Sequence, residues 1–170
     1  MKKLLYTLLS ACCMVFCTSC GTTAGMLGSN ATSQSNVYSS GQKVGTAIKN
    51  LYTQYKADGK FDTGNINNLV NIAALATNYN TLKETDKSSA FYGDLIKGMI
   101  VGSSNLVKEN TVDKVKDGIV SSLNGINIGT IINGAAQAVQ NSEAANTIQT
   151  TAAEMSKISN SISNIFSIFQ

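Results

Sequence analysis

The sequence INNLVNIAALATNYNTL, residues 66–82, decides the fold class of this chain. Its main apolar series follows the three- and four-residue spacing of an α-helix and consists of Ile66, Leu69, Val70, Ala73, Ala76 and Leu82. Ile72, Leu75 and Tyr79 widen the apolar face. A helix that is apolar over so much of its surface needs neighbours on several sides. We therefore expect residues 66–82 to lie at the centre of a helical bundle.

Four further stretches show the same helical period. They are expected as helices at residues 44–58, 88–106, 110–124 and about 128–169. Gly59 supplies a left-handed stop after the first of them, and Ser88 is the expected N-cap of the second. A break in the last can fall near Asn141. The sequence therefore predicts an all-α fold, a single bundle of about five helices.

The last of these segments carries a seven-residue repeat in its second half. Ile148, Met155, Ile162 and Phe169 recur every seven residues, and Thr151, Ile158 and Ile165 fill the intermediate position. Two interpretations stay open, because the repeat is short: a strip that packs on the chain's own bundle, or a coiled coil or partner-binding helix. The candidate contact for a protein partner is the tip formed by Ile162, Ile165, Phe166 and Phe169.

The first twenty residues have the pattern of an export signal. Lys2 and Lys3 precede an apolar run over residues 4–16, and small residues follow it. The run is shorter than the roughly 20 residues that a membrane-spanning helix needs. We therefore expect residues 1–19 to be a signal peptide that is removed.

The segment Cys17-Thr18-Ser19-Cys20-Gly21 resembles the lipobox of bacterial lipoproteins, in which small residues precede a cysteine that is acylated before cleavage. The resemblance implies that Cys20 is the lipid attachment residue and the new N-terminus. Position 17 departs from the family pattern, which usually has an aliphatic residue there. All four cysteines lie in this leader, where a redox or zinc centre would lack its folded setting or second ligand pair.

The resemblance also implies a location. Gly21 stands where an aspartate would signal retention at the inner membrane in enterobacterial relatives, which favours the outer membrane. Residues 21–25 lack the acidic run of surface-exported lipoproteins of the Bacteroidetes. In other respects the chain resembles proteins of that phylum, because it has many asparagines, lysine as its basic residue and a cysteine-rich lipobox. We therefore expect a periplasm-facing protein anchored by its lipid. The Gly, Ser, Thr and Asn content of residues 20–36 predicts a flexible tether, followed by an all-helical domain over residues 37–170.

Composition restricts the chemistry of that domain. The chain contains no histidine, arginine, tryptophan or proline. Without imidazole, the commonest general base and the commonest metal ligand are both absent. We therefore expect no catalytic residues, no cofactor and no metal. After removal of the leader, eleven lysines face ten acidic residues, and this balance argues against binding of nucleic acid.

Two acidic patterns could hold a cation. Residues 58–69 begin like a calcium loop, but Lys60 falls at position 3 and no glutamate falls at position 12, so a helix-to-helix turn is expected. Glu109, Asp113 and Asp117 recur every four residues on one helix face. Neighbouring lysines, Lys116 among them, are expected to neutralise this face as solvated surface.

Two pairs of glycines have the spacing that allows helices to approach closely. Gly41 and Gly45 form one pair, and Gly98 and Gly102 form the other. Lysines lie in or beside both segments, and neither segment is long enough to span a bilayer. Close packing inside a soluble bundle is therefore expected at both.

The expected function is a non-catalytic binding or scaffolding role in the cell envelope. One alternative is a carrier of a lipid or other apolar ligand, suggested by the wide apolar face of residues 66–82, which requires an internal cavity of several hundred Å³. Another is an envelope hydrolase with paired carboxylates. Its candidates are Asp58, Asp62, Asp86 and Asp94.

Overall fold

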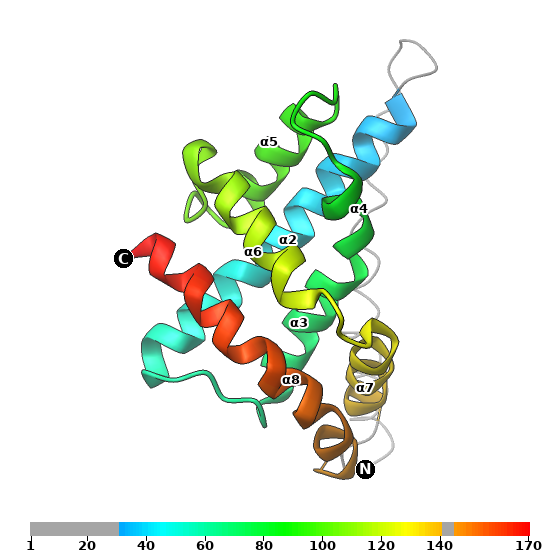
Figure 1. Ribbon diagram of the computed structural model, residues 1–170, viewed down its shortest axis with the longest axis vertical. Coiled ribbons are helices and arrows are strands. Elements are labelled where there is room, and N and C mark those ends of the chain that lie inside the picture. The colour runs from blue at the N-terminus through cyan, green and yellow to red at the C-terminus, as the bar shows by residue number, and fades with distance from the viewer. Residues whose placement is uncertain (1–30, 141–144) are drawn as a thin grey trace, which may run out of the picture. The chain divides into compact units, whose positions relative to one another are not determined.

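The computed structural model describes the backbone of residues 31–140 and 145–170 and the side chains of residues 36–140 and 151–170. The chain divides into residues 1–31 and a helical unit of residues 32–170, described here by itself. Throughout the described ranges the regular structure is helical, which confirms the all-α fold (Figure 1). Its elements are α2 Ala31–Asp58, α3 Ile66–Thr77, α4 Tyr79–Glu84, α5 Tyr92–Gly102, η1 Glu109–Thr111, α6 Val112–Leu123, α7 Ile128–Gln140, α8 Ala145–Phe166 and η2 Ser167–Phe169, where η marks a 3-10 helix.

Helix α3 has the central place that its apolar sequence predicts. Leu69 and Ile72 are fully buried, and Leu75 is 1% exposed. The helix packs against α7, α4 and α8. The side chain of Asn65 caps its start by accepting a hydrogen bond from the Asn67 amide, 2.8 Å away. The core of the bundle therefore forms around α3.

The helix boundaries between residues 66 and 92 differ from the prediction at two places. The expected single helix over residues 66–82 is broken at Asn78, whose side-chain amide donates to the Ala74 carbonyl at 2.8 Å, in competition with the backbone ladder. The expected N-cap Ser88 is also wrong, because the next helix begins at Tyr92. Ser88 instead donates from its hydroxyl to Asp86 at 2.7 Å within the preceding turn.

Helix α2 ends where the sequence predicts and begins earlier. Its last residue is Asp58, and Gly59 follows in the left-handed conformation with φ of 68°. Its first residue, Ala31, lies inside the segment expected to be tether, so residues 31–36 are helical instead. This polar stretch contains no proline and continues the helix that packs further on. The expected signal peptide, Cys20 and the rest of the tether lie outside the described residues.

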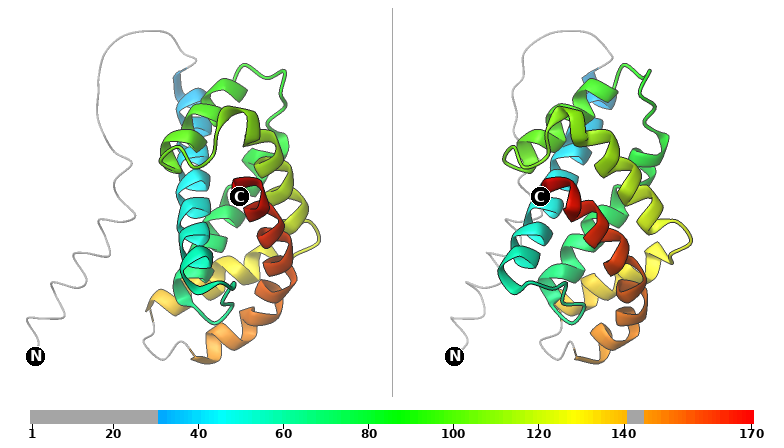
Figure 2. Two further views of the ribbon diagram at one scale, coloured as in Figure 1. Left: turned by 90° about the vertical axis from the view of Figure 1, so that its left-hand side faces the viewer. Right: turned by 60° about the vertical axis from the view of Figure 1, so that its left-hand side comes forward.

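Helices α2 and α5 meet at their backbones, as the glycine spacing predicts (Figure 2). A Cβ atom added to Gly98 would lie 2.3 Å from the Tyr38 carbonyl oxygen. One added to Gly45 would lie 2.3 Å from the Met99 carbonyl oxygen. No side chain fits in either place, so glycine allows the approach.

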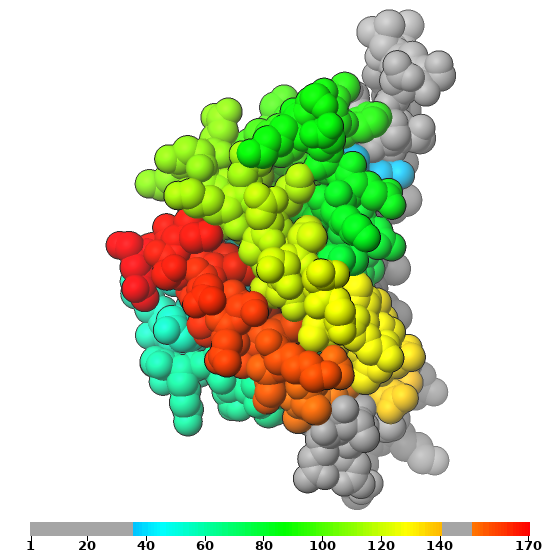
Figure 3. Space-filling model, in the orientation of Figure 1, coloured from blue at the N-terminus to red at the C-terminus, as the bar shows by residue number. Residues whose placement is uncertain are grey.

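Helix α8 uses its apolar repeat for the chain's own core. Met155 and Ile158 are fully buried, and the helix packs against α6 and α7. Figure 3 shows the surfaces of these three helices in continuous contact. The interpretation of the repeat as an intramolecular strip is therefore confirmed. Within the described part of the chain, no helix has both the length and the apolar character to cross a membrane.

Candidate functional site

A surface groove lies between helix α2 and the segment that joins α5 to η1. Its volume is about 590 Å³, and it is open to solvent. Its lining is Lys49, Tyr52, Thr53, Lys56 and Ala57 from α2, and Ser103, Ser104, Asn105 and Leu106 from the joining segment. We call it the α2 groove. Figure 2 (left) shows the joining segment and the C-terminal turn alongside the middle of α2.

The helical period of α2 creates one wall of the groove. Residues 49, 52, 53 and 56 follow the i, i+3, i+4, i+7 spacing and therefore share one face. Lys49 and Lys56 are two turns apart, which is about 10.5 Å along the helix axis. Lys56 and Thr53 are exposed, and Lys49 and Tyr52 are half-buried. The groove thus has two cationic positions separated by an aromatic ring, and its lining contains no acidic residue.

The opposite wall arises because α5 stops early. The sequence predicts a helix up to Leu106, but α5 ends at Gly102. Ser104 and Asn105 then adopt left-handed conformations, with φ of 53° and 66°. Such a conformation costs roughly 1–2 kcal/mol at a residue other than glycine. The cost is tolerated only where surrounding contacts fix the chain.

Several hydrogen bonds fix this wall. The Ser103 hydroxyl accepts from the Val107 amide at 3.0 Å in a buried position. The Asn105 amide donates to the Ile100 carbonyl at 2.9 Å. The Lys49 ammonium donates to the Ser104 hydroxyl at 2.8 Å and so bridges the groove. Ser104 and Asn105 themselves are exposed at the rim, where their side chains can contact an occupant.

A second hollow continues the groove toward the end of α2. Its volume is about 500 Å³, and it shares Tyr52 and Lys56 with the α2 groove. Its remaining lining is Tyr55, Gly59, Phe169 and Gln170. The ring centroids of Tyr52 and Phe169 are 5.4 Å apart in an edge-to-face arrangement. This ring pair holds the C-terminal turn on α2.

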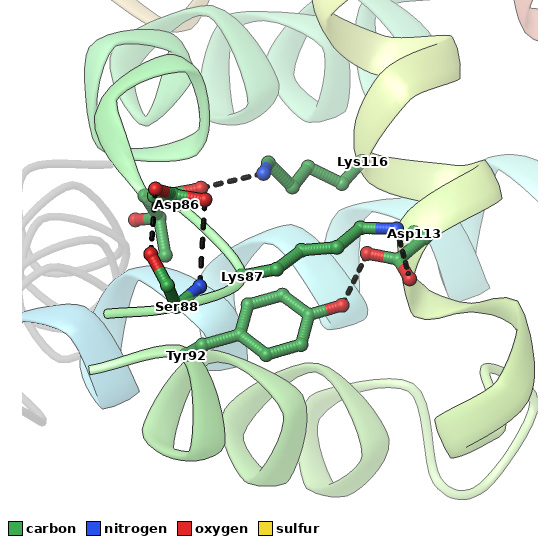
Figure 4. Close-up of polar contacts among 7 residues, drawn as sticks. Asp86, Lys87, Ser88, Tyr92, Asp113 and Lys116 are labelled. Atoms are coloured by element: carbon green, nitrogen blue, oxygen red, sulfur yellow. Dashed lines mark hydrogen bonds and ion pairs between the residues drawn. The ribbon is translucent and has the colours of Figure 1, made fainter. Parts of the chain in front are cut away.

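A polar cluster joins the segment after α4 to α6 (Figure 4). The Tyr92 hydroxyl donates to Asp113, and the Lys87 ammonium lies 2.8 Å from the same carboxylate. Burial, followed by the hydrogen bond to Asp113, raises the pKa of Tyr92 to about 12. The bonds from Lys87 and Tyr92 lower the pKa of Asp113. At neutral pH Tyr92 is therefore a poor acid and Asp113 is a poor base, which favours a structural role for the pair.

Lys116 completes this cluster from inside the bundle. It is 9% exposed, and its ammonium group donates to the Thr85 carbonyl at 2.5 Å. The same ammonium lies 5.9 Å from the centroid of the Tyr92 ring. Figure 4 shows Lys116 pointing from α6 toward the segment that holds Asp86. The cluster thus fastens residues 85–92 to α6.

The burial of Lys116 differs from the expectation, and the residues around it in the sequence contain a pattern that indicates this burial. The sequence pattern predicts a solvated face for this lysine, whereas the structure buries it. Val112 and Ile119 lie four residues before it and three after, so it shares their core-facing side. The α2 groove was missed because only the tertiary structure brings residues 49–57 and 103–106 together.

The predicted partner contact at the tip of α8 is largely used inside the molecule. Ile162, Ile165 and Phe166 are at most 2% exposed, so a partner cannot reach them while α8 is packed. The ring centroids of Phe166 and Tyr55 are 5.0 Å apart. Of the four predicted residues, Phe169 alone keeps partial exposure, in the second hollow.

The candidate carboxylates of the hydrolase alternative include two that serve local turns. Asp62 accepts from the Gly64 amide at 2.9 Å, which supports the turn expected there. Asp86 accepts from the Ser88 hydroxyl, and this bond is the main cause that lowers its pKa. Asp58 is exposed, and Asp94 lies in the first turn of α5. Within residues 31–140 and 145–170, no three His, Cys, Asp or Glu side chains gather as they would around a metal ion.

The fold defines the chain as an all-α helical bundle with an open lysine-lined groove. No protein-family model, no curated protein and no solved structure matches it.

Proposed function

We propose that this chain is a lipid-anchored protein of the bacterial cell envelope, whose helical domain binds a partner without catalysing a reaction. The anchor is the lipid on Cys20, after removal of residues 1–19. The absence of an aspartate at position 21 supports an outer-membrane location that faces the periplasm. In this proposal the membrane contact is made by the lipid, and the helical unit is left free to bind.

The α2 groove is the observation that carries the binding role. It combines an aromatic and aliphatic lining with two lysines and the exposed polar rim of Ser104 and Asn105. Binding sites commonly have this composition, with an apolar surface and a few polar groups that fix orientation. Most of the apolar face of α3, which suggested a carrier, is covered by the chain's own helices, although Ile66 is exposed. The α2 groove therefore offers a site for the binding role, whereas the apolar face of α3 serves to form the hydrophobic core.

Site-specific crosslinking in native membranes tests this role. A photoreactive side chain at Thr53, which is exposed in the groove, is expected to capture one discrete partner. The matched control places the same group at Gln137, an exposed residue of α7 outside the groove lining. Equal products from both positions, or no product from Thr53, would contradict binding at the α2 groove.

A further inference from the structure

The two lysines of the α2 groove have no acidic partner in the described part of the chain. Ion pairs within 4.0 Å are found there for Lys87 and Lys157, whereas Lys49 donates to a neutral serine hydroxyl. The side chains that line the groove include no carboxylate. The groove therefore presents uncompensated positive charge beside an apolar surface, and an anionic occupant complements it.

The spacing of the charges restricts the form of that occupant. Lys49 and Lys56 are about 10.5 Å apart along α2, with Tyr52 between them and Leu106 on the opposite wall. A helical segment with acidic residues at positions i and i+7 has the same axial spacing between those positions. An apolar residue at i+3 or i+4 of that segment would lie on the same face, against Tyr52 and Leu106.

The open side of the groove favours a peptide over a lipid tail. Thr53 and Lys56 are exposed on one wall, and Ser104 and Asn105 are exposed on the other. An acyl chain in such a groove would keep part of its apolar surface in water, which is unfavourable. An amphipathic helix can bury its apolar face and leave its polar face solvated.

We infer that the α2 groove binds an acidic amphipathic helical segment of a partner protein, with carboxylates two turns apart at Lys49 and Lys56. This inference rests on the proposed binding role and specifies its chemistry. The exposed Ser104 and Asn105 side chains supply hydrogen bonds at the rim, and their left-handed backbone is held ready by the Ser103 and Lys49 contacts.

A peptide titration tests the inference. The probe is a fluorescent 15-residue helical peptide with glutamates at positions 4 and 11 and leucines at 7 and 8. The second probe replaces both glutamates with glutamine. Fluorescence anisotropy with the full protein in detergent should show saturable binding of the acidic peptide, at least about tenfold tighter than of the glutamine peptide. Added salt should weaken it, because the charges are exposed.

Charge-matched variants locate the site. The double substitution Lys49→Gln and Lys56→Gln should weaken binding of the acidic peptide about tenfold, since each exposed charge contact contributes modestly. Lys43→Gln with Lys97→Gln removes the same charge from exposed positions outside the groove lining and should change it less than about twofold. Thr53→Glu keeps both lysines and should also weaken binding, because it places a negative charge between them. Circular dichroism checks that each variant is folded.

Three results would overturn the inference: equal binding of both peptides, equal loss in both double variants, or a Thr53→Glu protein that binds normally. Vesicles of phosphatidylglycerol provide the competing test. If they bind through Lys49 and Lys56 while the acidic peptide does not, the occupant is an anionic lipid headgroup instead. Failure here is distinguishable from failure of the proposed function, because capture from Thr53 in native membranes would persist if only the partner's chemistry were wrong.

Discussion

Lys116 lies on the core-facing side of α6, yet its ammonium group keeps two partners. It donates to the Thr85 carbonyl and lies over the Tyr92 ring, whose hydroxyl in turn donates to Asp113. A buried charge without such partners would carry a large desolvation cost. The residues of this cluster therefore depend on one another. Removal of one should weaken the attachment of residues 85–92 to α6.

Substitution Tyr92→Phe should lower the free energy of unfolding by about 1–2 kcal/mol, because it removes a hydrogen bond to a charged acceptor and keeps the ring. The control is Tyr79→Phe, since the Tyr79 hydroxyl has no hydrogen bond to the described residues. That variant should stay within about 0.5 kcal/mol of the wild type. Urea titration measures both, and equal losses would contradict the role assigned to Tyr92.

The raised pKa of Tyr92 also predicts a pH dependence. In the unfolded chain the phenol ionises near pH 10, whereas in the folded protein its pKa is about 12. The folded state thus favours the neutral form, and this contribution to stability is complete below pH 10 and lost between pH 10 and 12. The stability advantage of wild type over Tyr92→Phe should shrink across that interval. An advantage that stays constant up to pH 12 would contradict the burial of this hydroxyl.

Sequence reasoning at the residue scale succeeded for positions whose environment is set by near neighbours in the chain. Gly59 stops α2 as expected, because its left-handed conformation is a local requirement. The sequence predicts a solvated surface for both Lys116 and Asp113, because their partners, Thr85 and Tyr92, come from other elements. The apolar neighbours of Lys116 on its own helix indicate its burial, but the partners of such charged residues cannot be identified from one helix alone.

At the scale of the element, the packing of α2 on α5 depends on a lack of side chains. Gly41, Gly45, Gly98 and Gly102 bring the two backbones together, and the Thr46 hydroxyl donates to the Gly102 carbonyl at 3.2 Å. The four-residue spacing predicts a close approach at each pair, because it places both small residues of a pair on one helix face, but it does not identify the partner helix. The approach also sets the position of the α2 groove, since Ser103 follows α5 directly.

Substitution Gly98→Ala should therefore destabilise the protein by about 3 kcal/mol, because its methyl group would meet the Tyr38 carbonyl oxygen and force the helices apart. Gly93→Ala is the matched control in the same helix. A Cβ atom at Gly93 has no neighbour within 4 Å, so alanine should raise stability by about 0.5 kcal/mol through its helix preference. Thermal unfolding of both variants measures the difference, and similar midpoints would contradict the close packing.

Helix boundaries were predicted less well than helix faces. The apolar period identifies which side of a segment is buried, and it continues through Asn78 although the helix does not. Asn78 interrupts it by bonding to a carbonyl of its own preceding turn. At the start of α5, Ser88 bonds to Asp86 instead of capping the helix. Polar side chains that can bond to nearby groups in more than one way leave such boundaries undetermined by sequence.

At the scale of the whole molecule, the α2 groove and the proposed lipid anchor differ in whether a sequence pattern can predict them. The α2 groove requires α2, the end of α5 and the C-terminal turn to be packed together, so no sequence pattern contains it. The proposed export signal and lipid attachment at Cys20 rest on a contiguous pattern in residues 1–21. The anchor could therefore be proposed from sequence alone, whereas the binding site could not.

The proposed lipid on Cys20 would determine the compartment in which the α2 groove binds a partner. The first lysine after the leader is Lys43, so trypsin should release residues 20–43 as one N-terminal peptide. Mass spectrometry of membranes should find this peptide with fatty acyl groups on Cys20, and Cys17→Ala should leave it unchanged. Substitution Cys20→Ala should abolish the acylated peptide and its membrane attachment. A wild-type chain whose N-terminus is unmodified, or that still contains residues 1–19, would contradict the claim.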